Sequence, residues 1–319
     1  MKKTLIRNNH TLLEMLFVVV CVAILLKMLM PAFTESRNKA RFTRWLAFNR
    51  QCSNDPTCTV NFNFQDGKGK IINNSAIGNE NIKFDAKDYS GVIKGDYSWV
   101  QGRWWKGKKA LQFNGTNTLV EIEKEKALNF DETEGFTIII WVKFDRFRRW
   151  DGLFAKSYMA GEAGWSQYDL YYDGTEYTNK AAKGQFEVDV CRTCIGFDDV
   201  VIEENGTKTY NIKLDTEHWF MITLRNKMSG SKNEINVFIN DKKLVSRSTN
   251  NTQSSGTVCN ANLIIGALRF LVMGPNNTPT KQGSISNYFK GRVDEFIMYR
   301  RALEDSEIRG HFRMGDEHL

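Results

Sequence analysis

The most constraining feature of this sequence is a long apolar segment near its start. From Thr11 to Phe33 the only charged residues are Glu14 and Lys27. A helix over this segment is about 35 Å long, at about 1.5 Å per residue, which is enough to cross a hydrocarbon core of about 30 Å. Glu14 lies near the start of the helix, and Lys27 lies close enough to its far end to extend toward the interface. The segment therefore predicts a single membrane-spanning helix.

The basic residues of the chain are concentrated around this segment. Residues 1–50 hold nine Lys and Arg against two Asp and Glu, whereas the whole chain holds 44 and 37, so the remainder is neutral. Lys2, Lys3 and Arg7 precede the helix and predict a cytoplasmic N-terminus, with the rest of the chain outside. The excess charge next to the membrane favours anionic lipid. It is not the footprint of a nucleic-acid-binding protein, which requires a basic face on the folded domain.

The N-terminal segment resembles the leader and first helix of type IV pilins and type II secretion pseudopilins. The resemblance is carried by the basic leader, His10-Thr-Leu-Leu-Glu14, the apolar helix and Pro31. It implies cleavage by a prepilin peptidase between Asn9 and His10, which would leave Glu14 as the fifth residue. Asn9 stands where the family has glycine, and His10 where it has phenylalanine or methionine. An uncleaved single-pass anchor is the alternative.

The pilin resemblance also implies partners. In a filament, Glu14 would pair with the N-terminal amine of a neighbouring pilin-like subunit, because an unpaired charge in an apolar core is costly.

The cysteines of an exported domain are expected to form disulfides. Cys52 and Cys58 flank a five-residue polar loop and predict one bond. Cys191 and Cys194 form a CxxC pair, which either closes on itself or leaves one thiol to reach Cys259. A zinc site built from Cys52, Cys58, Cys191 and Cys194 is the alternative, although the first spacing is looser than in usual zinc sites.

Beyond residue 59 the sequence alternates between apolar and polar residues, and Gly, Asn and Asp separate the alternating runs. Asn240-Asp241 between two such runs predicts a hairpin turn. One late helix is predicted over Arg301–Ile308. The pattern predicts a mainly β fold, an antiparallel sandwich of two sheets that follows the N-terminal helix. The predicted strands are Val60–Phe64, Ala110–Phe113, Leu119–Ile122, Phe136–Phe144, Gly152–Lys156, Tyr168–Tyr172, Gln185–Val190, Thr209–Leu214, Trp219–Arg225, Glu234–Ile239, Lys243–Arg247, Asn262–Gly266 and Phe289–Tyr299.

The order of these runs resembles the LamG-like domain of the concanavalin A-like lectin and glucanase superfamily. The resemblance covers about residues 59–312 and implies a jelly-roll sandwich with glycan or protein ligands and, in some members, one calcium ion. The segments that carry it are Val60–Gly69, Lys109–Gly115 with Thr118–Ile122, Gly135–Val142, His218–Leu224 with Ile235–Lys243, and Phe289–Ile308.

Calcium candidates follow from this resemblance. Asp66 comes after the opening strand and Asp294 lies in the closing strand, at places where LamG-like domains carry ligands. Hard cations prefer clustered oxygen ligands. The alternative is structural: Asp66 forms a turn, and Asp294 bonds to the backbone.

Loop aromatics are the candidates for ligand contact. Trp150, Trp165 and Tyr168 lie in or near loops, where a flat ring can stack on a sugar or contact a protein, although large aromatic residues more often fill cores.

Residues for catalysis are hard to find in the sequence. The glucanase relatives of the fold cut glycosidic bonds with a Glu-x-Asp-x-x-Glu strand, and this chain has no such pattern. Its four histidines suggest neither a catalytic relay nor a metal cluster. The chain is therefore predicted not to be an enzyme.

The predicted organisation has five parts: a leader over 1–9, a pilin-like helix over 10–50, a Cys-flanked linker over 51–58, a LamG-like domain over 59–312 and a tail over 313–319. The predicted protein is a cell-membrane or pilus-associated surface subunit whose head binds glycan or protein ligands in adhesion. A purely structural filament or envelope subunit is the alternative, and a glycoside hydrolase is the third hypothesis.

Overall fold

The structure is a computed structural model, and it describes a long N-terminal helix and a β head. The described residues are 12–77, 89–104, 106–123, 128–130, 135–157, 166–173, 185–190, 193–198, 201–204, 207–210, 214–229, 232–244, 247–250, 261–270 and 284–316.

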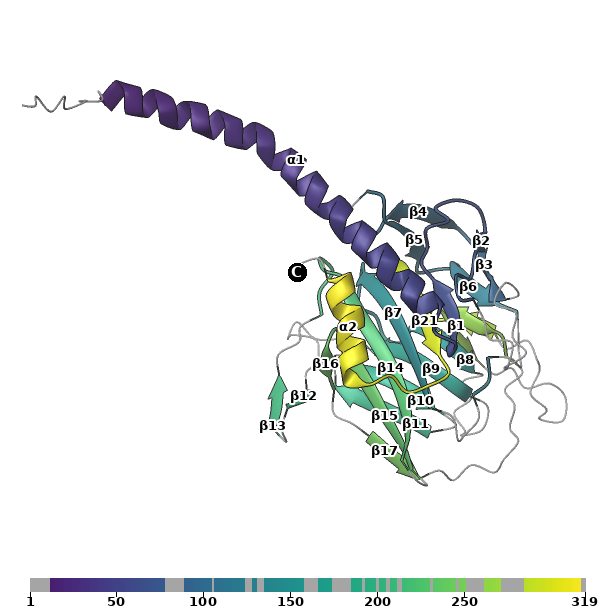
Figure 1. Cartoon of the computed structure of the whole chain (residues 1–319). Coiled ribbons are helices and arrows are strands. Elements are labelled where there is room, and N and C mark those ends of the chain that lie inside the picture. The colour runs from purple at the N-terminus through teal and green to yellow at the C-terminus, as the bar shows by residue number, and fades with distance from the viewer. Residues whose placement is uncertain are drawn as a thin grey trace, which may run out of the picture.

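Helix α1 (Leu12–Ser53) begins in the apolar segment and ends against the head. Its first part extends away from the rest of the molecule (Figure 1), and the large apolar side chains of Leu12 and of residues 15–33 are exposed. Pro31 lies inside the helix without ending it. Among the described residues, α1 has the length and apolar composition needed to cross a membrane.

The head is a sandwich of two antiparallel sheets. The order of the first sheet is β16 (Lys242–Lys243), β15 (Lys232–Ile239), β14 (Phe220–Ser229), β7 (Phe136–Phe144), β21 (Lys290–Tyr299), β5 (Lys109–Asn114) and β4 (Tyr97–Gln101), with β1 (Cys58–Phe62) paired to β21 and β17 (Arg247–Asn250) paired to β15. The order of the second sheet is β11 (Thr193–Asp198), β10 (Gln185–Val190), β9 (Ser166–Asp173), β8 (Asp151–Ser157), β18 (Leu263–Ile265), β6 (Leu119–Ile122), β3 (Gly91–Lys94) and β2 (Ile71–Ile72). Two hairpins complete the described strands: β12 (Val201–Glu204) with β13 (Thr207–Tyr210), and β19 (Leu268–Phe270) with β20 (Ser284–Ser286).

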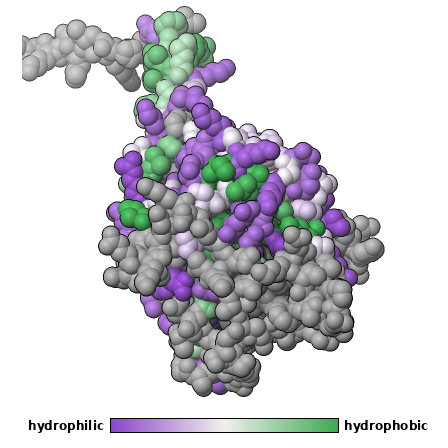
Figure 2. Space-filling model, turned by 90° about the vertical axis from the view of Figure 1, so that its right-hand side faces the viewer, coloured by the Kyte–Doolittle hydropathy of each residue, from purple (hydrophilic) through white to green (hydrophobic). Residues whose placement is uncertain are grey.

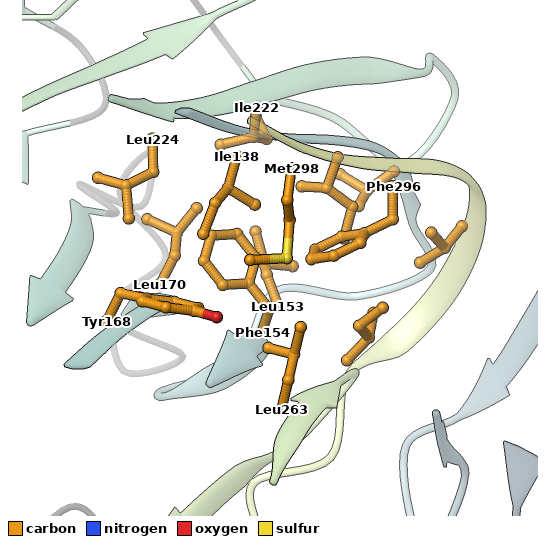
Figure 3. Packing of buried hydrophobic residues seen from close by; sticks show 14 of the residues in the cluster. Ile138, Leu153, Phe154, Tyr168, Leu170, Ile222, Leu224, Leu263, Phe296 and Met298 are labelled. Atoms are coloured by element: carbon orange, nitrogen blue, oxygen red, sulfur yellow. The ribbon is translucent and has the colours of Figure 1, made fainter. Parts of the chain in front are cut away.

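The main core lies between the two sheets. Ile138, Ile222 and Phe296 from the first sheet meet Phe154 and Leu170 from the second (Figure 3), and all of these side chains are fully buried. Burial of this much apolar surface is the main favourable term in folding.

Helices cover the other face of the first sheet. The C-terminal part of α1 and helix α2 (Asp305–Gly315) lie over it (Figure 1), and Ile139, Trp141 and Ile308 pack in this second layer. Strand β7 is therefore buried on both faces, which explains why Phe136–Phe144 is an apolar run rather than an alternating one.

The predicted fold class is confirmed. The Asn240-Asp241 turn joins β15 to β16, and Asn240 adopts φ 58°, the left-handed conformation that asparagine tolerates. The late helix begins at Asp305 rather than Arg301, and the Glu307 carboxylate accepts the backbone N–H of Glu304 at 2.8 Å. This is half of a capping box, and it fixes the start of the helix.

The predicted Cys52–Cys58 disulfide is wrong in this structure. Both residues are buried and carry free thiols. The Cys52 thiol lies 3.9 Å from Nε2 of His311, and the Cys58 thiol contacts the carbonyl of Val60 at 3.6 Å. Cys191, Cys259 and the side chain of Cys194 lie outside the described part of the chain, and the described residues contain no cluster of three or more His, Cys, Asp or Glu that would hold a metal.

Candidate functional site

The candidate site is the loop between β7 and β8, at one end of the sandwich. Trp150 ends this loop and is 36% exposed, whereas Trp45 and Trp141 are buried. Its backbone has φ 63°, which is strained for an aromatic residue, and such strain is concentrated at functional positions. The guanidinium carbon of Arg149 lies 4.3 Å from the centre of the indole ring. The loop thus presents a flat ring and a cation at the surface.

Arg146 holds the base of the loop. Its Nη2 donates to the carbonyls of Gly115 and Tyr288, each at 3.3 Å, and lies 3.7 Å from Oδ1 of Asp151. Gly115 has φ 77°, and a Cβ there would lie 2.9 Å from the Arg146 guanidinium. We call Arg146, Arg149, Trp150, Asp151 and Asn287 the Trp150 rim.

The Trp150 rim also contains buried polar groups with unused hydrogen-bonding capacity. The Asp151 carboxylate is only loosely paired among the described residues: Nη2 of Arg146 lies 3.7 Å from Oδ1, and Arg146 and Arg148 are the groups that favour its ionised form. Nε of Arg146 and Nδ2 of Asn287 have no hydrogen-bond partner among the described residues. Burial raises the pKa of Asp151 to about 7, although Arg146 and Arg148 oppose the shift. Unsatisfied buried groups are rare in proteins, and ordered water or a ligand usually satisfies them.

The raised pKa of Asp151 predicts a pH-dependent stability. Because the folded pKa lies above the usual 3.8, the folded state binds the proton more tightly, and the head loses stability as the pH rises from about 4 to about 7. The loss is at most about 4 kcal/mol. Thermal melting at pH 5 and pH 8 measures it, and Asp151→Asn should flatten the difference. Equal pH dependence in the variant would contradict the assignment to Asp151.

The other predicted ligand residues lie elsewhere. Tyr168 is fully buried: it packs against the stacked rings of Phe130 and Phe136, and its hydroxyl donates to the carbonyl of Leu128 at 3.1 Å. Its prediction as a ligand residue is therefore wrong. Trp165 lies outside the described residues.

The calcium candidates have other partners. Asp294 is fully buried, and its carboxylate lies 2.9 Å from Nε of Arg103 and 3.9 Å from Nζ of Lys108. Two cations therefore take the place that calcium would need, which corrects the assignment of Asp294. Asp66 accepts from the backbone and side chain of Asn73, as expected for a turn residue.

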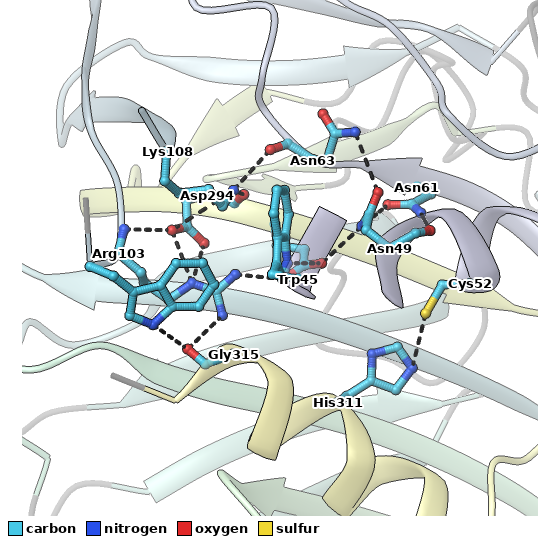
Figure 4. A network of polar contacts seen from close by, with 12 residues as sticks. Trp45, Asn49, Cys52, Asn61, Asn63, Arg103, Lys108, Asp294, His311 and Gly315 are labelled. Carbon is cyan, nitrogen blue, oxygen red and sulfur yellow. Dashed lines mark hydrogen bonds and ion pairs between the residues drawn. The ribbon is translucent and has the colours of Figure 1, made fainter. Parts of the chain in front are cut away.

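Asp294 belongs to a buried network that joins α1 to the head (Figure 4). A bulge in β21 between Val293 and Glu295 turns the consecutive carboxylates of Asp294 and Glu295 toward the helices. Nη2 of Arg103 lies 2.6 Å from Glu295, and Nε1 of Trp45 donates to the same carboxylate at 3.2 Å.

Further contacts complete this network, which we call the stem–head junction, where the stem is helix α1. Nζ of Lys108 lies 4.2 Å above the ring of Trp45, Asn49 donates to Glu295 at 3.1 Å, and Arg103 donates to the carbonyl of Gly315 at 3.3 Å. Burial opposes ionisation of Glu295, but Arg103 and Lys108 hold its pKa below the usual value, whereas burial lowers the pKa of Lys108 to about 8.

The sequence contains two signals for these residues. The first is Arg146-Phe-Arg-Arg-Trp-Asp151, which concentrates charged residues around Trp150. The second is Gly102–Lys108, whose glycine and lysine spacing resembles a phosphate loop by chance. Its Arg103 and Lys108 instead pair with the acidic bulge. Sequence reasoning missed both pairings because the partners are more than 180 residues away.

The Cys52–His311 contact is not a reactive pair. Burial raises the pKa of Cys52 to about 12 and lowers that of His311 to about 4. A nucleophilic cysteine requires the opposite charges, a thiolate beside an imidazolium. Tyr299 fills the remaining space, with its hydroxyl 3.2 Å from Nε2 of His311.

Comparison with known proteins identifies the fold family. Residues 114–309 match the family model described as the concanavalin A-like lectin/glucanases superfamily. No curated protein matches the chain.

Several solved structures are similar at low sequence identity. The binding domain of Paraclostridial Mosquitocidal Protein 1 is 17% identical over 80% of this chain and 52% of that chain, with a TM-score of 0.49. Domain 4 of AbnA, a GH43 extracellular arabinanase from Geobacillus stearothermophilus solved with arabinotriose, is 14% identical over 82% and 98%, with a TM-score of 0.47. The CBM40 of Ruminococcus gnavus IT-sialidase, bound to alpha2,3 sialyllactose, is 13% identical over 64% and 96%, with a TM-score of 0.42. The chain thus spans about half of the first structure and nearly all of the other two.

Proposed function

This chain belongs to the concanavalin A-like lectin/glucanase superfamily, and on that premise we propose that it is a membrane-anchored surface protein whose head binds a glycan at the Trp150 rim. The observation that carries the proposal is an exposed, strained Trp150 in the same rim as buried polar groups with unused hydrogen-bonding capacity. Sugar sites combine these two features, because a flat ring packs on the apolar face of a pyranose while polar groups bind its hydroxyls. The apolar part of α1 supplies the anchor.

We propose that the head binds its ligand without catalysis. Glycoside hydrolysis requires two carboxyl groups about 5–10 Å apart, one of them kept protonated. Burial disfavours ionisation of Glu121, but Lys94, Asn262 and Arg269 contact its carboxylate and hold its pKa below the usual value. Glu121 is therefore suited to an ion pair rather than to proton donation. Burial favours the protonated form of Asp151, but its described partners are Arg146 and Arg148, and no described contact pairs it with the second carboxylate that hydrolysis needs.

Replacing Trp150 by alanine tests the proposed site. Loss of the stacking surface is expected to weaken glycan binding about fivefold to tenfold, by analogy with aromatic pairs. A glycan array run with the full chain in detergent identifies the ligand, and calorimetric titration then compares wild type, Trp150→Ala and Trp150→Tyr. Tyr retains a flat ring and should recover most of the affinity.

Ile71→Ala is the matched control for this experiment. Ile71 is 47% exposed and belongs to β2, outside the rim, so this variant should bind as the wild type does. Equal affinity of wild type and Trp150→Ala would refute the rim as the site, and release of reducing sugar from a polysaccharide would favour the hydrolase.

A purely structural filament subunit is the second candidate. The exposed apolar surface of α1, with Glu14 near its start, favours this function, because the same helix can pack in a filament core. The N-terminal mass of the protein from its native membrane separates the two: a mature start at His10 supports prepilin processing and the filament. A chain that retains residues 1–9 is a simple anchored protein.

A further inference from the structure

The region where α1 leaves the head has a concentration of positive charge. Arg37, Lys39 and Arg44 are exposed on α1, and Arg41 is half-buried. Glu35 is the single acidic residue between Met15 and Asn54. Figure 2 shows the hydrophobic part of α1 above the head and hydrophilic atoms where the two meet.

Three of these cations share one face of the helix. Arg37, Arg41 and Arg44 follow the spacing i, i+4 and i+7, which places them in one row. The residues that face the head follow the same spacing eight positions later, at Trp45, Asn49 and Cys52. Eight residues correspond to a rotation of about 80° at 3.6 residues per turn, so the basic row lies beside the head contact rather than beneath it.

A lysine of the head contacts α1 close to these basic residues. Nζ of Lys106, in the loop between β4 and β5, is 3.3 Å from Oε1 of Glu35, and both side chains are well exposed. The loop cannot move freely from the head, because Arg103 ties it to Asp294. Glu35 is two residues beyond Phe33, the last exposed large apolar side chain of the helix. This ion pair therefore brings the head to the end of the apolar segment.

The heights along the helix place the first of these cations in the headgroup layer of a bilayer and the others successively farther out. If the hydrocarbon core ends near Phe33, then Arg37 lies about 6 Å, Arg41 about 12 Å and Arg44 about 17 Å beyond it. The headgroup region is about 5–8 Å thick on each side, and long basic side chains extend toward it. Arg44 is beyond direct contact but within about two Debye lengths of the surface.

We infer that Arg37, Lys39, Arg41 and Lys106 form a collar that binds anionic phospholipid headgroups and holds the head against the membrane surface, and that Arg44 adds a longer-range attraction to the same surface. This inference rests on the proposed membrane anchor. These five residues are all cationic, and Lys106 pairs with Glu35. A leaflet with anionic lipid complements the collar, whereas a zwitterionic leaflet does not.

The test uses the full chain in nanodiscs made of equal parts phosphatidylcholine and phosphatidylglycerol. Native mass spectrometry counts the lipids that remain bound after the disc is removed. We expect phosphatidylglycerol to be enriched in the wild type, and the triple variant Arg37→Gln, Arg41→Gln, Arg44→Gln to reduce that enrichment at least tenfold, since each cation near an anionic surface contributes about fivefold.

A second measurement reports on the head itself. Hydrogen exchange of residues 102–108 should slow severalfold in phosphatidylglycerol discs relative to phosphatidylcholine discs, and the triple variant should remove this difference. The matched control is Lys232→Gln, Lys242→Gln, Arg309→Gln, which removes three charges from exposed positions of the head and should behave as the wild type.

The outcomes separate this inference from the anchor. A chain that does not enter nanodiscs contradicts the membrane anchor itself. A chain that enters but retains both lipids equally, or whose enrichment survives in the triple variant, overturns the collar. Equal loss in the control variant would mean that only net charge matters, which also overturns it.

Discussion

Replacing Asp294 by alanine is expected to lower the free energy of unfolding by about 3–5 kcal/mol, the usual cost of removing one partner from a buried ion pair. The substitution leaves Arg103 and Lys108, both fully buried, without their shared anion. It also removes the acceptor of the Arg103 backbone N–H, which donates to Asp294 at 2.9 Å. Thermal unfolding of the full chain in detergent, followed by near-ultraviolet circular dichroism, measures the change. For a domain of this size we expect a decrease in Tm of about 6–20 °C.

Asp66→Ala is the control for Asp294→Ala. Asp66 bonds to Asn73 at the surface, so its loss should cost less than about 1 kcal/mol. Repeating both measurements with calcium and with a chelator distinguishes the two assignments of Asp294. If calcium raised the Tm of the wild type, and both variants lost that increase, then the aspartates would share a cation and the ion-pair assignment would be wrong.

The strands of the sandwich were predictable wherever burial imposes a pattern. Phe136–Phe144, Leu119–Ile122 and Gln185–Val190 match β7, β6 and β10 residue for residue. Their side chains meet a core on at least one face, so the apolar pattern and the strand bounds have the same cause. Strands β3 and β4 were missed, because they are short, half-buried elements near sheet edges. Backbone hydrogen bonds to the neighbouring strands, rather than an apolar sequence pattern, define β3 and β4 as strands.

The candidate site was only partly predictable. Trp150 was identified from its place in a loop, but its neighbours Arg146 and Asn287 come together only when β8 and β21 are in place. Tyr168 was misassigned because a buried strand end and a loop have similar sequences. The Cys52–Cys58 bond was inferred from spacing and compartment alone. The side-chain directions, which place Cys52 beside His311 and Cys58 beside Val60, depend on how α1 crosses the sheet.

The second large effect is expected at Trp45, because this residue joins the stem to the head. Its side chain is 1% exposed, donates to Glu295 and lies under the Lys108 ammonium. Trp45→Ala should cost about 3–5 kcal/mol, since it leaves a large cavity and removes a donor from a buried carboxylate. Trp45→Phe keeps most of the ring and loses the donor, so it should cost about 1–3 kcal/mol.

Proteolysis shows whether the stability lost in Trp45→Ala is lost only where α1 meets the head or in the whole sandwich. If the stem–head junction holds the two parts as one body, Trp45→Ala should both speed tryptic cleavage at the arginines of α1, because the helix loses its packing against the head, and lower the Tm of the sandwich. A stem that becomes cleavable while the sandwich melts as in the wild type would show that the head folds independently of α1. The distinction matters for the proposed function, because only a rigid junction fixes the direction in which the Trp150 rim faces relative to the membrane. A flexible junction would let the rim search for a glycan, whereas the buried ion pairs of Arg103 with Asp294 and Glu295 favour a fixed presentation.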